Sequence, residues 1–262
     1  MFDNHLKALW ASGGQAIGGW ATLGSPFATE VLAVAGFDYV CVDLQHGLAH
    51  AETMVPMLIA TARTGVTPLV RVPANANDAI GKALDAGAHG VIVPMVNSGE
   101  QAAAAVAACR YAPDGVRSFG PVRAGLQTAG MSLADVNAQI LCLPMVETWE
   151  AVERIDEICA TPGVDGIYIG PSDLSVTLGL PPYSDPVADE LTAAVERVRA
   201  AARAAGLPVG IHTPSGRQAR AYLDQGLDMV TVSTDAAILR TAVTAELGAA
   251  RGTAAGTATG GY

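Results

Sequence analysis

The chain repeats one pattern eight times between about residues 16 and 250. In each repeat, a short run of β-branched or apolar residues ends in proline, glycine or a charge, and an alanine-rich stretch typical of a helix follows. The apolar runs are Ala16–Leu23, Tyr39–Leu44, Pro68–Val72, Gly90–Met95, Ile140–Val146, Gly166–Ile169, Pro208–Ile211 and Met229–Val232. Strands that alternate with helices form parallel sheets. Eight such units predict an α/β fold, the (β/α)8 TIM barrel, rather than an open sheet.

The repeats also indicate how the chain divides. Several predicted helices end at a glycine that can adopt the left-handed conformation of a helix C-cap, namely Gly36, Gly65, Gly87, Gly163, Gly206 and Gly226. No change in composition marks a domain boundary, so residues 1–250 are expected to form one domain. The longest interruption, Tyr111–Gln139, is long for a barrel loop, which suggests a functional segment. The low-complexity residues 251–262 are expected to form a flexible tail.

Composition restricts the partners and the location. The 262 residues carry a formal net charge of −10 and no basic cluster, so nucleic acid and anionic membranes are poor partners. The apolar runs are much shorter than a membrane span, and no secretory signal is visible. The cysteines lack metal-site spacing and are expected to be buried, reduced thiols of a cytoplasmic protein; they are Cys41, Cys109, Cys142 and Cys159.

Two carboxylates follow neighbouring strands of the predicted barrel. Glu147 ends the fifth apolar run and Asp173 follows the sixth, with one predicted helix, 148–160, between them. Because parallel strands lie about 4.8 Å apart, acids at the same ends of two strands can share a divalent cation. Each acid alone could instead cap a helix, but the pair favours a metal site. Oxygen ligands without His or Cys indicate Mg²⁺ or Mn²⁺, and also Co²⁺, rather than structural zinc.

Further polar residues are expected at this same end of the barrel, where the sites of TIM-barrel enzymes lie. They follow the predicted strands and comprise Ser25, Asp43, Gln45, His46, Arg71, His212 and Ser233. Arg71 can donate two hydrogen bonds to a developing enolate oxygen; alternatively, it forms a structural ion pair with Asp43. The carboxylate of Asp43 can orient the imidazole of His46 for proton transfer.

These residues suggest one kind of chemistry. A metal on Glu147 and Asp173 leaves positions open for the keto and carboxylate oxygens of a 2-oxo acid, and its Lewis acidity makes an enolate accessible. A Schiff-base aldolase would instead need a lysine inside the barrel. The only lysines, Lys7 and Lys82, do not follow a predicted strand. An aldolase with this sequence would therefore depend on a metal. No glycine-rich nucleotide-binding motif is present.

Several segments resemble the HpcH/HpaI aldolases, which are metal-dependent pyruvate aldolases of the 4-hydroxy-2-oxoheptanedioate aldolase type. The resemblance covers roughly residues 5–250 and is carried by residues 37–46, 68–72, 84–94, 146–148 and 170–175. It implies a barrel whose last helix is exchanged between subunits, in a homohexamer built from dimers. It also implies a Mg²⁺, Mn²⁺ or Co²⁺ ion on Glu147 and Asp173.

The resemblance further implies roles for individual residues. Arg71 would contact the enolate oxygen, and a His46–Asp43 dyad would transfer the proton. Backbone amides around Ser172 and Asp173 would hold the pyruvate carboxylate. Asp85 resembles the family's acid that reaches the site of a neighbouring subunit. Arg117 resembles the arginine of the family's Gly-x-Arg-Gly loop and would order the long interruption.

Two positions depart from the family's pattern. Met145 stands where members commonly carry Gln, and it should face the barrel mouth because residues i and i+2 of a strand share a face. His212 stands where members tend to have an apolar residue. It could bind a polar aldehyde or a distal carboxylate, or contact a subunit interface. Both departures leave the acceptor aldehyde open, and pyruvate and hydroxypyruvate are both open as donors.

Two alternatives remain at the level of the sequence. One is a lyase acting on CoA thioesters, related to citrate and malyl-CoA lyases, which also hold Mg²⁺ with a Glu and an Asp. Those enzymes are generally larger and carry basic residues for the CoA phosphates, and this chain has few basic residues near the predicted strand ends. The other is a non-catalytic barrel that binds an oxo acid or a metal, but no added interaction module supports it.

Overall fold

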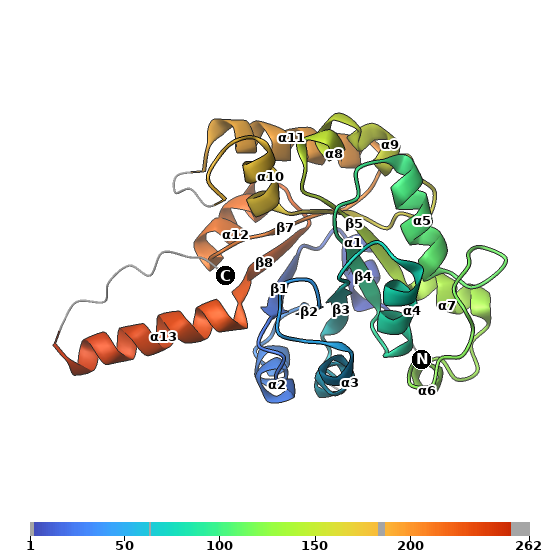
Figure 1. The fold of residues 1–262 in the computed structure, drawn as a ribbon, viewed down its shortest axis with the longest axis horizontal. Coiled ribbons are helices and arrows are strands. Elements are labelled where there is room, and N and C mark those ends of the chain that lie inside the picture. Colours follow the sequence, from blue (N-terminus) through green and yellow to red (C-terminus); the bar gives the residue numbers. More distant parts are fainter. Residues whose placement is uncertain (1–2, 63, 183–186, 253–262) are drawn as a thin grey trace.

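The structure, a computed structural model, describes residues 3–252 except residue 63 and residues 183–186. Eight parallel strands close into a barrel in chain order (Figure 1). They are β1 Ala16–Ala21, β2 Tyr39–Asp43, β3 Thr67–Arg71, β4 Gly90–Val93, β5 Leu141–Val146, β6 Ile167–Ile169, β7 Val209–His212 and β8 Met229–Thr234. This confirms the predicted (β/α)8 barrel. Apart from residues 251 and 252, the expected tail lies outside the described residues.

Most of the helices surround the barrel, and a helix follows each strand or its loop as predicted (Figure 1). They are α1 His5–Ala11, α2 Pro26–Val34, α3 Ala51–Ala60, α4 Asn77–Asp85, α5 Gly99–Cys109, α6 Ala124–Gln127, α7 Leu133–Gln139, α8 Trp149–Glu153, α9 Ile155–Cys159, α10 Pro171–Thr177, α11 Asp189–Ala204, α12 Gly216–Asp224 and α13 Asp235–Ala250. The six glycines predicted to end helices all have positive φ, between 70° and 97°. The single helix expected over residues 148–160 is wrong: it is two helices, divided at Arg154, whose φ is −101° and ψ 16°.

Two apolar layers hold the barrel together. The outer layer lies between the strands and the helices and contains most of the buried Val, Ile, Leu and Ala residues. The inner layer fills the barrel itself, and Trp20, Tyr168 and Met145 are among its largest side chains. At the N-terminal ends of the strands, Leu6 of α1 is fully buried in this inner layer. The four cysteines are buried and unpaired, as predicted.

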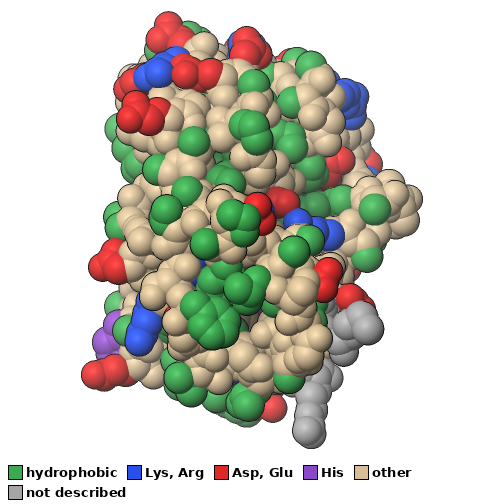
Figure 2. Space-filling model, turned by 90° about the vertical axis from the view of Figure 1, so that its right-hand side faces the viewer, with side chains coloured by type: hydrophobic (Ala, Val, Ile, Leu, Met, Phe, Trp, Pro, Cys, Tyr) green, Lys and Arg blue, Asp and Glu red, His purple; other side chains and the backbone are tan. Residues whose placement is uncertain are grey.

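The long interruption between β4 and β5 contains α6 and α7. Arg117 anchors it: its side chain donates to Asp85 at 2.7 Å, and its guanidinium lies 4.4 Å from the ring centre of Tyr111. The same segment exposes Phe119 and Val122, which are 70% and 88% accessible. Hydrophobic side chains gather on the face that carries α5 to α7 (Figure 2).

The last helix, α13, extends away from the barrel (Figure 1). Asp235 at its first position is buried, and the rest of the helix is half-buried or exposed. Its exposed residues include Ile238, Leu239, Val243 and Leu247. Among the described residues, none of the helices combines the length and the apolar character that crossing a membrane requires.

Candidate active site

Glu147 stands directly after β5 and is 1% exposed. Its Oε1 accepts a hydrogen bond from the Met95 amide at 2.7 Å. Its Oε2 is buried and has no hydrogen-bond partner among the described residues. Burial raises the pKa of Glu147 to about 7; the negative charge of Asp173 adds to this rise, and the Met95 amide opposes it. A buried carboxylate oxygen without a partner is expensive, so this oxygen is available to a ligand from outside the chain.

Asp173 lies in the first turn of α10, directly after β6, with its side chain exposed. Gly170 is the N-cap of this helix and packs closely against Glu147. A Cβ atom at Gly170 would lie 2.7 Å from Glu147 Oε2 and 2.6 Å from Met145 Cε. Such contacts are too short, so a residue without a side chain is required beside the carboxylate. The carboxylate of Glu147 therefore fills the space that a side chain at position 170 would need.

These features fit a divalent cation. The donor set is two carboxylates whose charges repel each other, and one of them carries an unpartnered buried oxygen. Within the described ranges, no group of three or more His, Cys, Asp or Glu side chains could hold a metal. Mg²⁺ is typically bound by one or two carboxylates together with water and substrate oxygens. Glu147 and Asp173 therefore suit an ion that shares its coordination with a substrate.

Asp43 and Arg71 form a buried ion pair across β2 and β3. Arg71 Nε donates to Asp43 Oδ1 at 2.8 Å, and Arg71 Nη2 donates to Oδ2 at 2.5 Å. The two residues are 0% and 1% exposed. Burial would raise the pKa of Asp43, but the hydrogen bonds and charge of Arg71 outweigh it and hold this pKa below its usual value. The ion pair considered as an alternative for Arg71 is thus present, and it fixes the plane of the guanidinium.

Trp20 completes this arrangement and was not singled out from the sequence. Its Nε1 donates to Asp43 Oδ2 at 3.2 Å, and the Arg71 guanidinium lies 5.2 Å from its ring centre. The ring also stacks on Tyr168 at 5.6 Å and meets the edge of His212 at 5.1 Å. The only sequence signal was its alternation with Gly18 on β1, which places both residues inside the barrel.

His46 lies in the loop after β2 and is exposed. Asp43 Oδ1 accepts hydrogen bonds from the main-chain amides of Gln45 and His46, at 3.0 and 3.3 Å. The loop is thus tied to the same carboxylate that holds Arg71. Of the other polar residues expected at strand ends, Ser25 caps α2 by accepting from the Ala28 amide.

His212 ends β7 and is half-buried against Trp20. Burial lowers the pKa of His212 to about 4, the positive charge of Arg71 lowers it further, and Asp43 opposes this. The imidazole is therefore neutral, not cationic, at neutral pH. Met145 is 3% exposed in the inner layer and brings no polar group to Glu147.

Asp85 is the one predicted site residue that the chain does not bring to this mouth. It is the last residue of α4, which runs back from the end of β3 to the start of β4. Asp85 therefore lies at the N-terminal ends of the strands, where it pairs with Arg117. Ser172, by contrast, lies next to Asp173 in the first turn of α10 and is half-buried.

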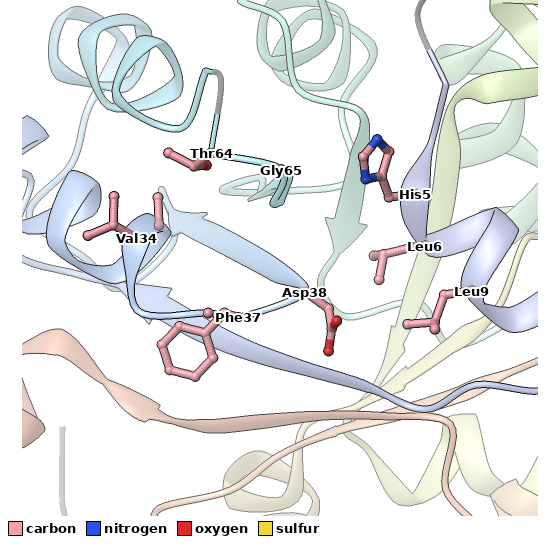
Figure 3. A pocket seen from close by; sticks show the side chains of 10 residues that line it. His5, Leu6, Leu9, Val34, Phe37, Asp38, Thr64 and Gly65 are labelled. Carbon is pink, nitrogen blue, oxygen red and sulfur yellow. The ribbon is translucent and has the colours of Figure 1, made fainter.

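A hollow of about 610 Å³ lies at the opposite end of the barrel. His5, Leu6 and Leu9 of α1 line it together with Phe37 and Asp38 before β2 (Figure 3). None of the carboxylates and cations described above contributes to it. The chemistry-bearing side chains gather at the C-terminal ends of the strands instead, as in other TIM barrels.

Comparison with known proteins agrees with this geometry. Residues 16–242 match the HpcH/HpaI aldolase/citrate lyase family. A hydroxypyruvate/pyruvate aldolase from Rhizorhabdus wittichii is 41% identical over 91% of this chain and 95% of its own. A 5-keto-4-deoxy-D-glucarate aldolase from Klebsiella pneumoniae is 38% identical over 92% and 94%. A crystal structure of a family protein from Burkholderia cenocepacia superposes with a TM-score of 0.84 at 34% identity, over 90% of this chain and 95% of the other.

The barrel and these relatives define a carbon–carbon lyase of the pyruvate aldolase type. The chain belongs to the HpcH/HpaI aldolase/citrate lyase family. This confirms the resemblance inferred from the motifs after β2, β5 and β6.

Proposed function

We propose that the protein is a divalent-metal-dependent aldolase that cleaves or forms 4-hydroxy-2-oxo acids through the enolate of a pyruvate-type donor and an aldehyde. The observation that carries this proposal is the Glu147–Asp173 pair, with its unpartnered buried oxygen. The pair lies at the same strand ends as the Asp43–Arg71 ion pair. A divalent cation on Glu147 and Asp173 would supply Lewis-acid polarisation of the donor's keto group.

The chain's own residues then have distinct roles. Arg71, held in plane by Asp43 and Trp20, stabilises the negative charge on the enolate oxygen; one such donor is typically worth about 3–4 kcal/mol of the barrier. His46 moves the proton at the hydroxyl that derives from the aldehyde.

The donor carboxylate would bind at the start of α10. Its N-cap, Gly170, has no side chain to satisfy the amides of the first turn. Amides at a helix start that lack internal partners attract anions. The amides of Ser172 and Asp173 therefore suit the carboxylate of the 2-oxo acid.

Enolate formation provides the first test of this function, because it does not require the aldehyde to be known. We expect the methyl protons of pyruvate to exchange in D₂O when the protein carries Mn²⁺ or Mg²⁺. Exchange should vanish after EDTA treatment and in Glu147→Gln, and NMR measures it directly. No exchange from folded protein with any metal would contradict the pyruvate donor. Hydroxypyruvate, a CoA thioester and a non-catalytic barrel would then be tested in that order.

His212 is proposed to contact the acceptor. The names of the two relatives indicate polar substrates for those enzymes, and a neutral imidazole can donate a hydrogen bond to a hydroxyl or carboxylate. Replacing His212 by Phe keeps a ring against Trp20 but removes that bond. We expect kcat/KM to fall roughly 3- to 10-fold for glycolaldehyde and glyoxylate, and to change less for propanal, because a hydrogen bond contributes about 0.5–1.5 kcal/mol. An equal fall for all three aldehydes would remove His212 from acceptor recognition.

We also propose that the protein acts as a homo-oligomer. Besides the apolar residues of α13, helix α2 exposes Phe27, Val31 and Val34, which are 74%, 52% and 68% accessible. Apolar patches of this kind mark protein interfaces. Exchange of α13 between two copies would cover them, and the family resemblance extends the assembly to a hexamer in which Asp85 serves a neighbouring site. Light scattering of the full chain tests the proposal, and a monomer at micromolar concentration would contradict it.

A further inference from the structure

Met95 has a backbone conformation that its side chain does not favour. Its φ is +57°, in the left-handed region, although it is not glycine. Unbranched L-residues adopt this region rarely, and Asn and Gly adopt it more readily. Such outliers persist where the surrounding structure fixes them, and they cluster at functional sites. Met95 follows the end of β4 by two residues, at the same end of the barrel as Glu147.

Bonds made by the three residues after Met95 hold the turn in place. The next amide, of Val96, donates to the carbonyl of Met145 at 3.3 Å. Asn97 accepts from the hydroxyl of Thr148 at 2.7 Å, and Ser98 caps α5 by accepting from an amide at 3.1 Å. The chain is thus fastened to the end of β5 and to the residue after Glu147. Met95, the left-handed residue, thus lies between the end of β4 and the residues that make these contacts.

The turn directs one amide at the proposed metal ligand. Met95 N–H donates to Glu147 Oε1 at 2.7 Å, whereas Glu147 Oε2 is the oxygen without a partner. The side chain of Met95 is 47% exposed. Its contact with the buried Glu147 is therefore made by its backbone amide. One carboxylate oxygen is held by the protein and the other is left for a ligand.

We propose that Met95 is a positioning residue: its left-handed turn aims the amide that fixes Glu147 Oε1, so that Glu147 offers Oε2 to the divalent cation. This inference rests on the proposed function, because it assumes the cation. Groups that orient a metal ligand in this way typically contribute about 10–100-fold to metal affinity. The conformation of the backbone, rather than the methionine side chain, is what the site needs.

Substitutions at Met95 separate backbone from side chain. Met95→Gly and Met95→Asn favour the left-handed turn and keep the amide. They should bind Mn²⁺ within about twofold of the natural protein. Met95→Val also keeps the amide, but a β-branched residue resists φ > 0. It should bind Mn²⁺ about 10–100-fold more weakly. Met95→Ala shares the backbone preference of methionine, so it should bind Mn²⁺ like the natural protein and controls for loss of the side chain. Met95→Thr, which is also β-branched, carries the test if Met95→Val does not fold.

The measurement is the dissociation constant of Mn²⁺, obtained from the EPR signal of the free ion, with Glu147→Gln alongside. Loss of binding in Glu147→Gln, with Gly, Asn and Ala at position 95 binding tightly and Val or Thr weakly, would support the inference. Equal affinities for the β-branched variants and for Gly, Asn and Ala at this position would overturn it while leaving the metal site intact. Equal binding by Glu147→Gln and the natural protein would overturn both the inference and the metal site of the proposed function.

Discussion

Replacing Asp43 by Ala is expected to lower the free energy of unfolding by about 3–5 kcal/mol, because it leaves a buried charge without its partner. Arg71 is 1% exposed and makes two hydrogen bonds to Asp43, at 2.8 and 2.5 Å. The substitution also removes the acceptor of Trp20 Nε1. Urea unfolding at neutral pH measures the change. A loss below 1 kcal/mol would show that water or another group readily replaces Asp43.

A double variant distinguishes the buried charge from other causes of the loss. Asp43→Ala combined with Arg71→Met removes both charges and fills part of the space. Replacement of a buried ion pair by apolar side chains is often neutral or stabilising, so the double variant should regain most of the lost stability. It should nevertheless show no pyruvate proton exchange, because the donor to the enolate oxygen is gone. If the loss of stability in the double variant equals the sum of the losses in Asp43→Ala and Arg71→Met, the two residues are not coupled.

The ion pair is therefore compatible with the catalytic role proposed for Arg71. The sequence presented them as alternatives because Asp43 and Arg71 end adjacent strands, and either role fits that placement. In the structure, the pair uses Nε and Nη2 and so orients the whole guanidinium plane. A guanidinium held in this way needs little reorganisation when charge develops on a substrate.

The fold could be predicted because it rests on local patterns. The eight apolar runs coincide with β1 to β8 to within two residues at their ends, and glycine alone explains the helix ends at positive φ. The placement of Glu147 and Asp173 followed from the same pattern, because strand ends in a barrel share one face. Asp85 could not be placed in this way. Its resemblance to a family acid assigned it to a site, but within a single chain it lies at the N-terminal ends of the strands, away from Glu147 and Asp173.

What sequence could not provide are contacts that depend on tertiary geometry. Trp20 reads as one more apolar residue of a strand, and only the closed barrel brings its Nε1 to Asp43. Met95 has no sequence signal at all, because methionine does not favour a left-handed turn. The division of residues 148–160 at Arg154 was equally hidden, since both halves have helical composition.

Replacing Glu147 by Gln is expected to stabilise the metal-free protein while abolishing its proposed activity. The pKa of Glu147 is raised from 4.5 to about 7, chiefly by burial. The unfolded chain releases this proton at lower pH than the folded protein. The contribution of Glu147 to the free energy of unfolding is therefore fully present below about pH 4.5 and is lost as the pH rises to 7. The loss approaches about 3 kcal/mol, because each pKa unit corresponds to 1.36 kcal/mol. Glutamine does not ionise, and its Oε1 can still accept from the Met95 amide.

The difference between the two proteins should therefore depend on pH and on metal. Below about pH 4.5 their unfolding free energies should agree, and at pH 8 the Gln variant should be more stable by about 3 kcal/mol. Mn²⁺ at 100 times its dissociation constant should stabilise the natural protein by about 2.7 kcal/mol and leave the variant unchanged. Denaturant unfolding with EDTA or Mn²⁺ measures all four states. A natural protein as stable as the variant at pH 8 without metal would mean that Glu147 ionises there without penalty. The buried carboxylate would then cost the metal-free protein no stability. The predicted loss of stability is instead typical of functional sites, where a group needed for binding is kept although it destabilises the fold.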